Sequence, residues 1–375
     1  MGPVAALQRH PLRVLLVLVP LAPALRHLVG AADSLVFASS ALAVVPLAAE
    51  IGRITERLAD RWGEGVGGLV HATFGNAAEF IIAILALAGG HYALVKASIT
   101  GSILANVLLV FGVGVIYGGL RHETLRFNRK AANLTATMLV LSVIALVVPA
   151  VFHLAVAPGH RGRDLDLSVL IAVVLLVTYL LSLVFALRTH RHLYTDPHAG
   201  EAEADGAGRD GAGGDGSAAS SPEASLPGDL LVLAGATAAV VWMSELLVDT
   251  TVAAARELGM SEVFVGVVVV ALVGNAAERS AVLPLAGEGR MDAVIQATVG
   301  SSIQIALFVA PVLLFLSYLV GPRPMDLEFT TLEVMAVTVS AGIMTFIAQG
   351  GETHWMNGVQ LVAVYLILAV AFYLA

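Results

Sequence analysis

The five residues Gly75-Asn76-Ala77-Ala78-Glu79 lie inside an apolar stretch, and the same five letters return as Gly274-Asn275-Ala276-Ala277-Glu278. On a helix, positions three and four apart are neighbours, so the Gly, Asn and Glu of each copy share one face. An ionisable residue at membrane depth costs roughly 3 kcal/mol on insertion scales, which usually indicates a functional reason. The alternative, a pair of polar helix-packing contacts, explains the Gly and Asn but not two matched Glu.

The composition is that of a polytopic membrane protein. Of 375 residues, 58% are hydrophobic and 13% are charged, whereas a soluble domain carries about 25% charged residues. The absence of Cys excludes disulfides and thiolate metal sites. No small-residue cleavage site follows the first apolar run, so we expect a spanning helix there and not a signal peptide.

A helix of about 20 apolar residues crosses a bilayer. Eleven such spans are expected, near 12–29, 34–52, 65–89, 92–119, 131–152, 168–187, 229–252, 262–286, 291–320, 330–349 and 356–374.

A shift of 199 residues superimposes the two Glu motifs and also places Gly101-Ser102 on Gly300-Ser301. The spans therefore divide into one unrepeated helix and two copies of five. Because five is odd, the second copy inserts upside down, which is the inverted-repeat plan of secondary transporters. We expect an all-α membrane protein with an N-terminal helix in 1–30, a first repeat in 31–188, a linker in 189–228 and a second repeat in 229–375.

The predicted linker is rich in Gly, Ala, Ser, Asp and Glu. Such a segment buries too little apolar surface to order itself, so we expect a flexible tether, with a regulatory role for its acidic residues as the alternative.

Lys and Arg concentrate in segments on the side of the N-terminus, around 53–61, 121–130 and 188–191. This bias predicts a cytoplasmic N-terminus and linker and an external C-terminus. The composition favours a location in the cell membrane, specifically in a bacterial inner membrane.

A second polar motif follows in each half, as Thr100-Gly-Ser-Ile-Leu-Ala-Asn106 and as Val299-Gly-Ser-Ser-Ile-Gln304. Carboxylate, amide, hydroxyl and backbone oxygens suit hard cations, although interhelical hydrogen bonds are the alternative for each neutral residue. The predicted cation site comprises Gly75, Asn76, Glu79, Gly274, Asn275, Glu278, Ser102, Asn106, Ser301, Ser302 and Gln304. The proton-transfer candidates are Glu79, Glu278, Glu245, Glu50, Asp249 and His71.

With both Glu motifs and both Gly-Ser motifs in this order, the chain resembles the calcium/proton (cation/proton) antiporter family of the cation/calcium exchanger superfamily. Sodium/calcium exchangers usually have Thr-Ser-x-Pro-Glu where this chain has Asn-Ala-Ala-Glu, which favours the proton-coupled branch. The resemblance covers nearly the whole chain. It implies that Glu79 and Glu278 bind the cation together with Asn76, Asn275 and backbone carbonyls.

We expect a secondary active transporter, and not an enzyme, that exchanges cytoplasmic calcium for external protons by alternating access. Two carboxylates in a low-dielectric site repel each other, so the empty site carries protons, and calcium binding expels them. No GxxxxGK[ST] motif for ATP is present, so an ion gradient is expected to drive transport. The expected partners are calcium, protons and the lipid bilayer; we expect no nucleic acid and no cofactor beyond the transported ion. A homo-oligomer is compatible with the sequence.

Three rival functions stand beside this expectation. A sodium or potassium/proton antiporter, or a sodium/calcium exchanger, uses the same scaffold and the same two glutamates. An intramembrane hydrolase requires two membrane aspartates, a His-Glu-x-x-His motif or a Ser/His pair, and within the predicted spans Asp249 is the single plausible aspartate. A passive channel is disfavoured by the repeat, which indicates alternating access.

Overall fold

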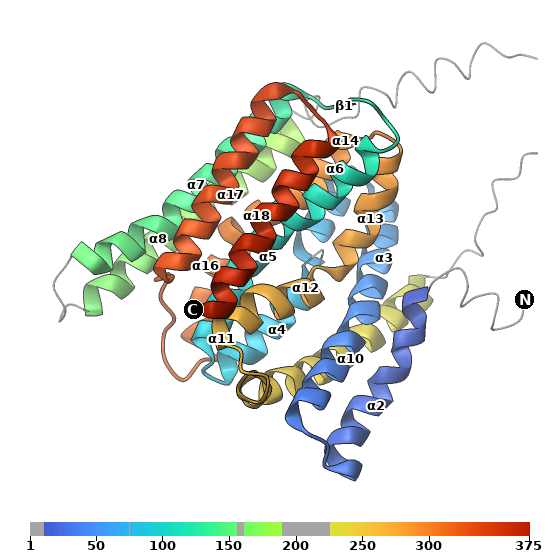
Figure 1. The fold of residues 1–375 in the computed structure, drawn as a ribbon, viewed down its shortest axis with the longest axis vertical. Helices are drawn as coiled ribbons and strands as arrows, with labels where there is room; N and C mark the ends of the chain where they lie inside the picture. Colours follow the sequence, from blue (N-terminus) through green and yellow to red (C-terminus); the bar gives the residue numbers. More distant parts are fainter. Residues whose placement is uncertain (1–10, 75, 156–160, 190–225) are drawn as a thin grey trace, which may run out of the picture.

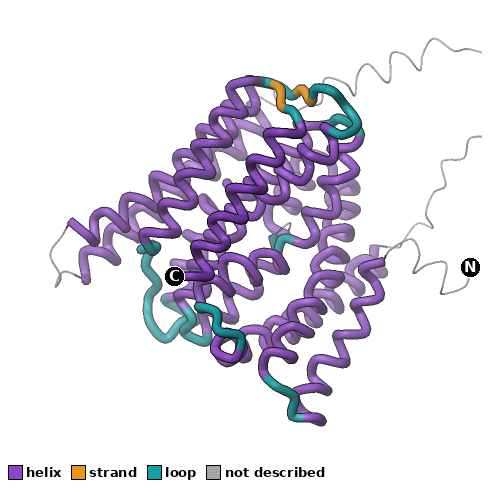
Figure 2. Tube along the Cα trace, in the orientation of Figure 1, coloured by secondary structure: helices purple, strands orange, loops and turns teal. Residues whose placement is uncertain are grey.

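The structure is a computed structural model that describes residues 11–74, 76–155, 161–189 and 226–375. Side chains are described throughout these ranges except at 11–13, 60, 62–74, 161–162, 187 and 276–281. This part of the chain is almost entirely helical, as Figure 2 shows. Most of the predicted linker, 189–228, lies outside the described residues.

The first half begins with a helical region made of η1 (Pro11–Val17), α2 (Leu18–Ala24) and η2 (Leu25–Val29). It continues with α3 (Asp33–Phe74), α4 (Ala77–Ala88), α5 (Tyr92–Leu104), η3 (Ala105–Val110), α6 (Phe111–Gly119), β1 (Leu125–Arg126), α7 (Arg129–Ala155), α8 (Arg161–Val184) and η4 (Phe185–Thr189).

The second half comprises α10 (Leu226–Glu257), α11 (Glu262–Phe264), η6 (Val265–Val270), α12 (Ala271–Gly274), α13 (Ala276–Gly287), α14 (Met291–Ile295), η7 (Gln296–Gly300), α15 (Ser301–Gln304), η8 (Ile305–Val309), α16 (Ala310–Ser317), α17 (Thr331–Gly350), β2 (Glu352–Thr353) and α18 (Trp355–Leu374). Here η1 is a 3₁₀-helix and the other η segments are π-helical.

Among the described residues, 8 helical stretches are long and apolar enough to cross a membrane. Three shorter apolar helices, Val14–Val29, Ala77–Ala88 and Glu262–Gly274, accompany them. A helix satisfies its own backbone hydrogen bonds, which is what a lipid environment requires. The expected all-α membrane fold with many spans is confirmed.

Helix α3 differs from the expected layout. The sequence predicted spans at 34–52 and 65–89 with an interruption between them, but α3 runs from Asp33 to Phe74 and the next helix, α4, begins at Ala77, inside the Glu motif. The intervening segment Arg53-Ile-Thr-Glu-Arg-Leu-Ala-Asp is charged. Its Arg, Glu, Leu and Ala residues are good helix formers, so charge can end an apolar run without ending the helix.

The two halves pack against each other through corresponding elements. Helix α3 packs on α10 and α7 packs on α17, and in each pair the partners hold equivalent positions in the two halves. Two further pairs of contacts are reciprocal: α13 packs on α3 as α4 packs on α10, and α18 packs on α6 as α8 packs on α16. Figure 1 shows α2 and α10 at one flank of the molecule and α7 and α8 at the opposite flank.

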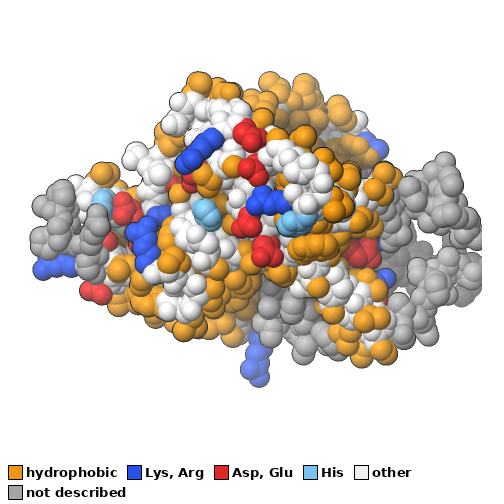
Figure 3. Space-filling view, turned by 90° about the horizontal axis from the view of Figure 1, so that it is seen from below, with side chains coloured by type: hydrophobic (Ala, Val, Ile, Leu, Met, Phe, Trp, Pro, Cys, Tyr) orange, Lys and Arg blue, Asp and Glu red, His pale blue; other side chains and the backbone are white. Residues whose placement is uncertain are grey.

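Polar contacts also join the halves at the start of α10 and at two short strands. Arg57 Nη2 lies 2.9 Å from Asp229 Oδ1, which ties α3 to the start of α10. The two-residue strands β1 and β2 pair antiparallel, with Leu125 opposite Thr353. On the face seen in Figure 3, charged side chains gather near the middle and hydrophobic side chains surround them. An apolar perimeter of this kind suits a lipid environment.

Candidate functional site

Each Glu motif interrupts a helix. Asn76 stands between α3 and α4 with φ −103° and ψ 29°, and Asn275 stands between α12 and α13 with φ −76° and ψ 12°. Because the backbone leaves the helical path at these residues, the first turns of α4 and α13 begin at the motif. Glu79 and Glu278 are the third residues of these two helices. Broken helices of this kind form the midplane sites of many transporters.

The second motif of the first half is held against the second half by two glycines. A Cβ added to Gly101 of α5 would overlap the backbone of Val267 in η6, and a Cβ added to Gly266 would lie 2.5 Å from Ala97 Cβ. The backbones of α5 and η6 therefore approach as closely as glycine permits. This contact brings Ser102, one residue after Gly101, to the second Glu motif.

A chain of hydrogen bonds links the polar residues of the two halves. Asn275 Nδ2 donates to Ser102 Oγ at 3.0 Å, and Asn106 Nδ2 donates to Asn275 Oδ1 at 3.0 Å. Asn106 Nδ2 also lies 3.3 Å from Ser301 Oγ, which donates to Asn76 Oδ1 at 3.0 Å. Every one of these bonds joins a residue of the first half to a residue of the second. We call these five residues the central network.

The central network is buried and nearly symmetric. All five side chains are classed as buried, and Asn106 is 0% exposed. The pair Asn275–Ser102 is the counterpart of the pair Asn76–Ser301 under the shift of 199 residues. Among the described residues, Asn76 Nδ2 is buried without a hydrogen-bond partner. Buried polar groups are nearly always paired. The N–H groups of Asn76 can therefore donate a hydrogen bond to a further oxygen at this point of the network.

The carboxylate of the first motif lies against the glycine of the second. A Cβ added to Gly274 would lie 2.7 Å from Glu79 Cγ and 3.3 Å from Glu79 Oε1. Glu79 is partly exposed, whereas Asn76, one turn away, is buried. Gly75 and the side chains of Glu278 and His71 lie outside the described residues.

The described oxygens at this place are suited to a hard cation. They are one carboxylate, the amides of Asn76, Asn106 and Asn275, and the hydroxyls of Ser102 and Ser301. Within the described residues, no three His, Asp or Glu side chains gather where they could hold a metal ion. Ions such as calcium take six to eight oxygen ligands, including neutral amide and carbonyl oxygens.

Comparison with known protein families identifies the family of this chain. The profile described as sodium/calcium exchanger protein matches residues 33–188 and 229–374, one segment in each half. The chain belongs to the sodium/calcium exchanger family. This match confirms the resemblance to the cation/calcium exchanger superfamily, and relatives named as Ca(2+)/H(+) antiporters confirm the resemblance to its calcium/proton branch.

Relatives of this family member include two bacterial proteins named for one activity. A "Ca(2+)/H(+) antiporter" of Synechocystis sp. is 41% identical over 96% of this chain and 96% of its own length. The "Ca(2+)/H(+) antiporter ChaA" of Bacillus subtilis is 37% identical over 91% of this chain and 93% of its own length. The solved structure of native YfkE matches with a TM-score of 0.80 at 33% identity, over 97% of this chain and 100% of that one.

Five other predicted residues of this exchanger-family protein are placed differently from the central network. Ser302 Oγ donates to Thr298 O of its own helix at 3.0 Å, and Gln304 is partly exposed. Glu50 pairs with Arg53 on the next turn of α3. Glu245 and Asp249 lie four residues apart on α10, and both are exposed.

One buried carboxylate of this family member was not among the predicted site residues. Glu333 at the start of α17 is 3% exposed, and its Oε1 accepts a hydrogen bond from Thr100 Oγ1 at 3.2 Å. Its Oε2 accepts bonds from Thr330 N and Thr330 Oγ1. The spacing Thr330-x-x-Glu333 is a capping box, which is visible in the sequence. The contact with Thr100, next to Gly101-Ser102, is a tertiary one.

Proposed function

We propose that the chain is a secondary active transporter that exchanges cytoplasmic calcium for external protons by alternating access. The observation that carries the proposal is the central network, in which the hydrogen bonds between its five residues all cross between the halves. A site built from both halves can open to either side when the halves move relative to each other. The relatives that carry the name calcium/proton antiporter support calcium and protons as the exchanged ions.

The proposed architecture is eleven spans, with one N-terminal helix and two inverted repeats of five. The eight long helices and three shorter apolar helices within the described residues support this number. The reciprocal packing of the halves supports the repeat. The π-helical segments η3 and η8 also hold corresponding positions, each just after a Gly-Ser motif. Such segments occur often at functional sites.

The proposed site centres on Glu79 and Glu278. Their carboxylates bind the cation, and the amides of Asn76 and Asn275, the side chains of Ser102, Asn106 and Ser301, and the backbone at Gly75 and Gly274 supply further oxygens. In this arrangement the Asn oxygens accept hydrogen bonds while no cation is bound and turn to the cation when it enters. Two neighbouring carboxylates repel each other unless a cation or protons neutralise them, so the site binds either the cation or protons but not both at once.

The proposed proton path uses carboxylates on the long helices. Glu50 on α3 and Asp249 on α10 are counterparts under the shift of 199 residues, and Glu245 lies one turn from Asp249. The exposed positions of Glu245 and Asp249 on a spanning helix support contact with water, because a lipid-facing carboxylate is costly. His71, in the α3 turn before the first motif, is a further candidate.

The proposed orientation has a cytoplasmic N-terminus and linker and an external C-terminus, in a bacterial inner membrane. The excess of Lys and Arg on the side of the linker supports it. The ion pair between Arg57 and Asp229 lies on this side, where α10 begins after the linker. A homo-oligomer remains compatible with this layout.

The test is ion-driven proton movement in liposomes that contain the purified protein and a pH-sensitive dye. Calcium added outside acid-loaded liposomes is expected to release protons, and Glu79→Gln is expected to abolish this release. Glu352→Gln, on exposed β2, is the matched control and should exchange like the wild type. Sodium, potassium and manganese are compared in the same assay. Full exchange by Glu79→Gln contradicts the site, and a response to sodium or potassium but not to calcium contradicts the choice of ion.

A further inference from the structure

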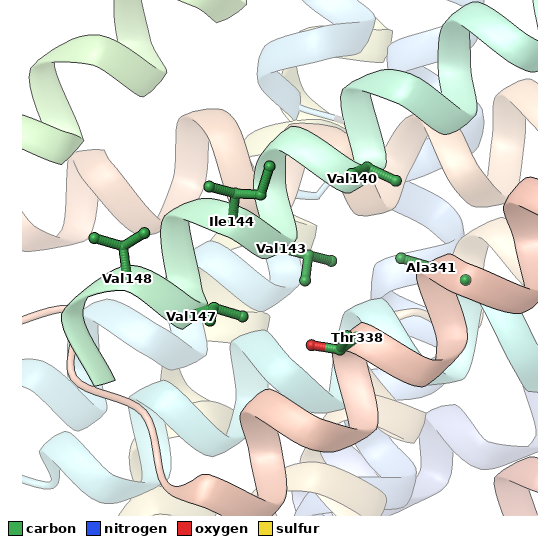
Figure 4. A pocket seen from close by; sticks show the side chains of 8 residues that line it. Val140, Val143, Ile144, Val147, Val148, Thr338 and Ala341 are labelled. Atoms are coloured by element: carbon green, nitrogen blue, oxygen red, sulfur yellow. The ribbon is translucent and has the colours of Figure 1, made fainter. Parts of the chain in front are cut away.

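A groove lies between α7 and α17, outside the central network. It has a volume of about 340 Å³ and is lined by Val140, Val143, Ile144, Val147, Val148, Thr338, Ala341 and Gly342. Figure 4 shows Val143 and Val147 of α7 facing Thr338 and Ala341 of α17 across it, while Ile144 and Val148 point away from α17. Helices α7 and α17 are equivalent elements of the two halves, so the groove lies on the seam between them.

We infer that this groove binds one acyl chain of a membrane lipid. Its walls are apolar, since all its lining residues except Thr338 are aliphatic or Gly. Thr338 Oγ1 donates to Val334 O at 2.7 Å, so the hydroxyl is already paired within α17 and the side chain offers its methyl group. Nothing in the groove therefore binds a headgroup, an ion or a peptide backbone, each of which requires polar partners.

The depth of the groove fits the tail of a lipid. Thr338 and Gly342 lie 7 and 11 residues after the first residue of α17, Thr331, which is about 10–17 Å along the axis at 1.5 Å per residue. Half of the hydrocarbon core is about 15 Å thick. The groove therefore faces the ends of acyl chains and not the polar headgroups.

The two helices are tied at both ends, which keeps the groove open between them. At one end, β1 and β2 pair next to the start of α7 and the end of α17. At the other end, His153 Nε2 of α7 lies 3.3 Å from Glu328 Oε1, three residues before α17. A Cβ added to Gly342 meets no atom within 4 Å, so the wall at this glycine has no protein neighbour to fill the space. Packed interiors leave few voids of this size.

The size of the groove favours a flexible chain over a second protein. At roughly 30 Å³ per small group, the volume accommodates about ten methylene groups. A stable protein interface buries about 1,200–2,000 Å² in total, far more than the few side chains here present. Ile144 and Val148 are 51% and 41% exposed, so the groove opens laterally and a chain can enter from the bilayer.

The test uses the full-length protein in nanodiscs that contain a phospholipid with a photoreactive diazirine near the end of one acyl chain. After illumination, labelled positions are mapped by mass spectrometry. Labelling of 140–148 and 338–342 is expected to exceed labelling of α8 several-fold. Helix α8 is the reference because Val173, Val174 and Leu181 are also exposed and apolar.

Variants test whether the groove itself holds the chain. Gly342→Leu fills it and is expected to reduce labelling there to the level of α8. Gly235→Leu is the matched control, because Gly235 of α10 also has open space at its Cβ, and it should leave the labelling of the groove unchanged. Labelling no denser in the wild-type groove than on α8 overturns the inference, and so does cross-linking of the groove to a second copy. The wild-type map decides by itself if a variant fails to fold.

Discussion

Glu79 of the first half packs against Gly274 of the second so closely that a methyl group on this glycine would lie 2.7 Å from Glu79 Cγ. The two residues belong to different copies of the same five-letter motif. A carboxylate of the proposed cation site is thus positioned by the absence of a side chain on the opposite helix, and this relationship leads to the first prediction.

Gly274→Ala is expected to weaken calcium-dependent exchange while the protein still folds. The added methyl group must displace the Glu79 side chain near its root, and overpacking of this kind costs about 1–3 kcal/mol. With this cost in the bound state, the calcium concentration for half-maximal exchange is expected to rise about 5- to 140-fold, since each 1.4 kcal/mol is a factor of ten. Gly235→Ala is the control, because open space surrounds its Cβ. Equal calcium dependence for the two variants contradicts the contact.

Substitutions of two neighbouring serines, Ser301 and Ser302, are expected to differ sharply in their effect on exchange. Ser301 donates to Asn76 and lies within reach of Asn106, whereas Ser302 donates to Thr298 O of its own helix. Ser301→Ala leaves buried polar partners unpaired, at a cost of about 1–3 kcal/mol, and is expected to impair exchange. Ser302→Ala is expected to exchange nearly as the wild type does. Initial rates across a calcium series in liposomes measure both, and the reverse order of effects would refute the assignment.

Substitutions of Asn106 and Ser301 are expected to have non-additive effects on apparent calcium affinity. Because Asn106 Nδ2 contacts both Ser301 and Asn275, removal of either Asn106 or Ser301 disturbs the same bonds. A double-mutant cycle of Asn106→Ala and Ser301→Ala on apparent calcium affinity is expected to give a coupling of about 0.5–3 kcal/mol. Asn106→Ala combined with Thr178→Val on exposed α8 is the additive control. Strict additivity of the first pair argues against the network.

Thr100→Val is expected to reduce thermal stability more than it reduces exchange. Thr100 donates to Glu333, a buried carboxylate at the start of α17, and valine keeps the shape but removes the donor. An unmet buried acceptor costs about 1–3 kcal/mol. The melting temperature of the purified protein measures this loss, with Thr178→Val as control, since the Thr178 hydroxyl donates to Val174 O of its own helix. Unchanged melting means that the bond contributes little.

Much of the site was predictable because its motifs repeat. The shift of 199 residues paired Asn76 with Asn275 and Ser102 with Ser301, and the structure joins these residues in two equivalent cross-half contacts. The sequence could not distinguish Ser301 from Ser302, because adjacent residues on a helix point about 100° apart and only the neighbouring helices decide which direction faces the site. The capping box of Glu333 can be read from the sequence because it is a local pattern, whereas the burial of Glu333 against Thr100 is a tertiary contact.

The continuous helix α3 was missed for a related reason. Hydropathy locates the end of an apolar run, but the charged residues after Ile51 keep a helical backbone as far as Phe74, and the non-helical Asn76 directly precedes α4. By itself, the sequence determined the spanning character, the doubled motif and the kinds of oxygen available, because these follow from composition and from comparison of the chain with itself. Only the tertiary structure decided which oxygens meet and that Gly274 receives Glu79, because such contacts depend on how closely two backbones approach across the boundary between the halves.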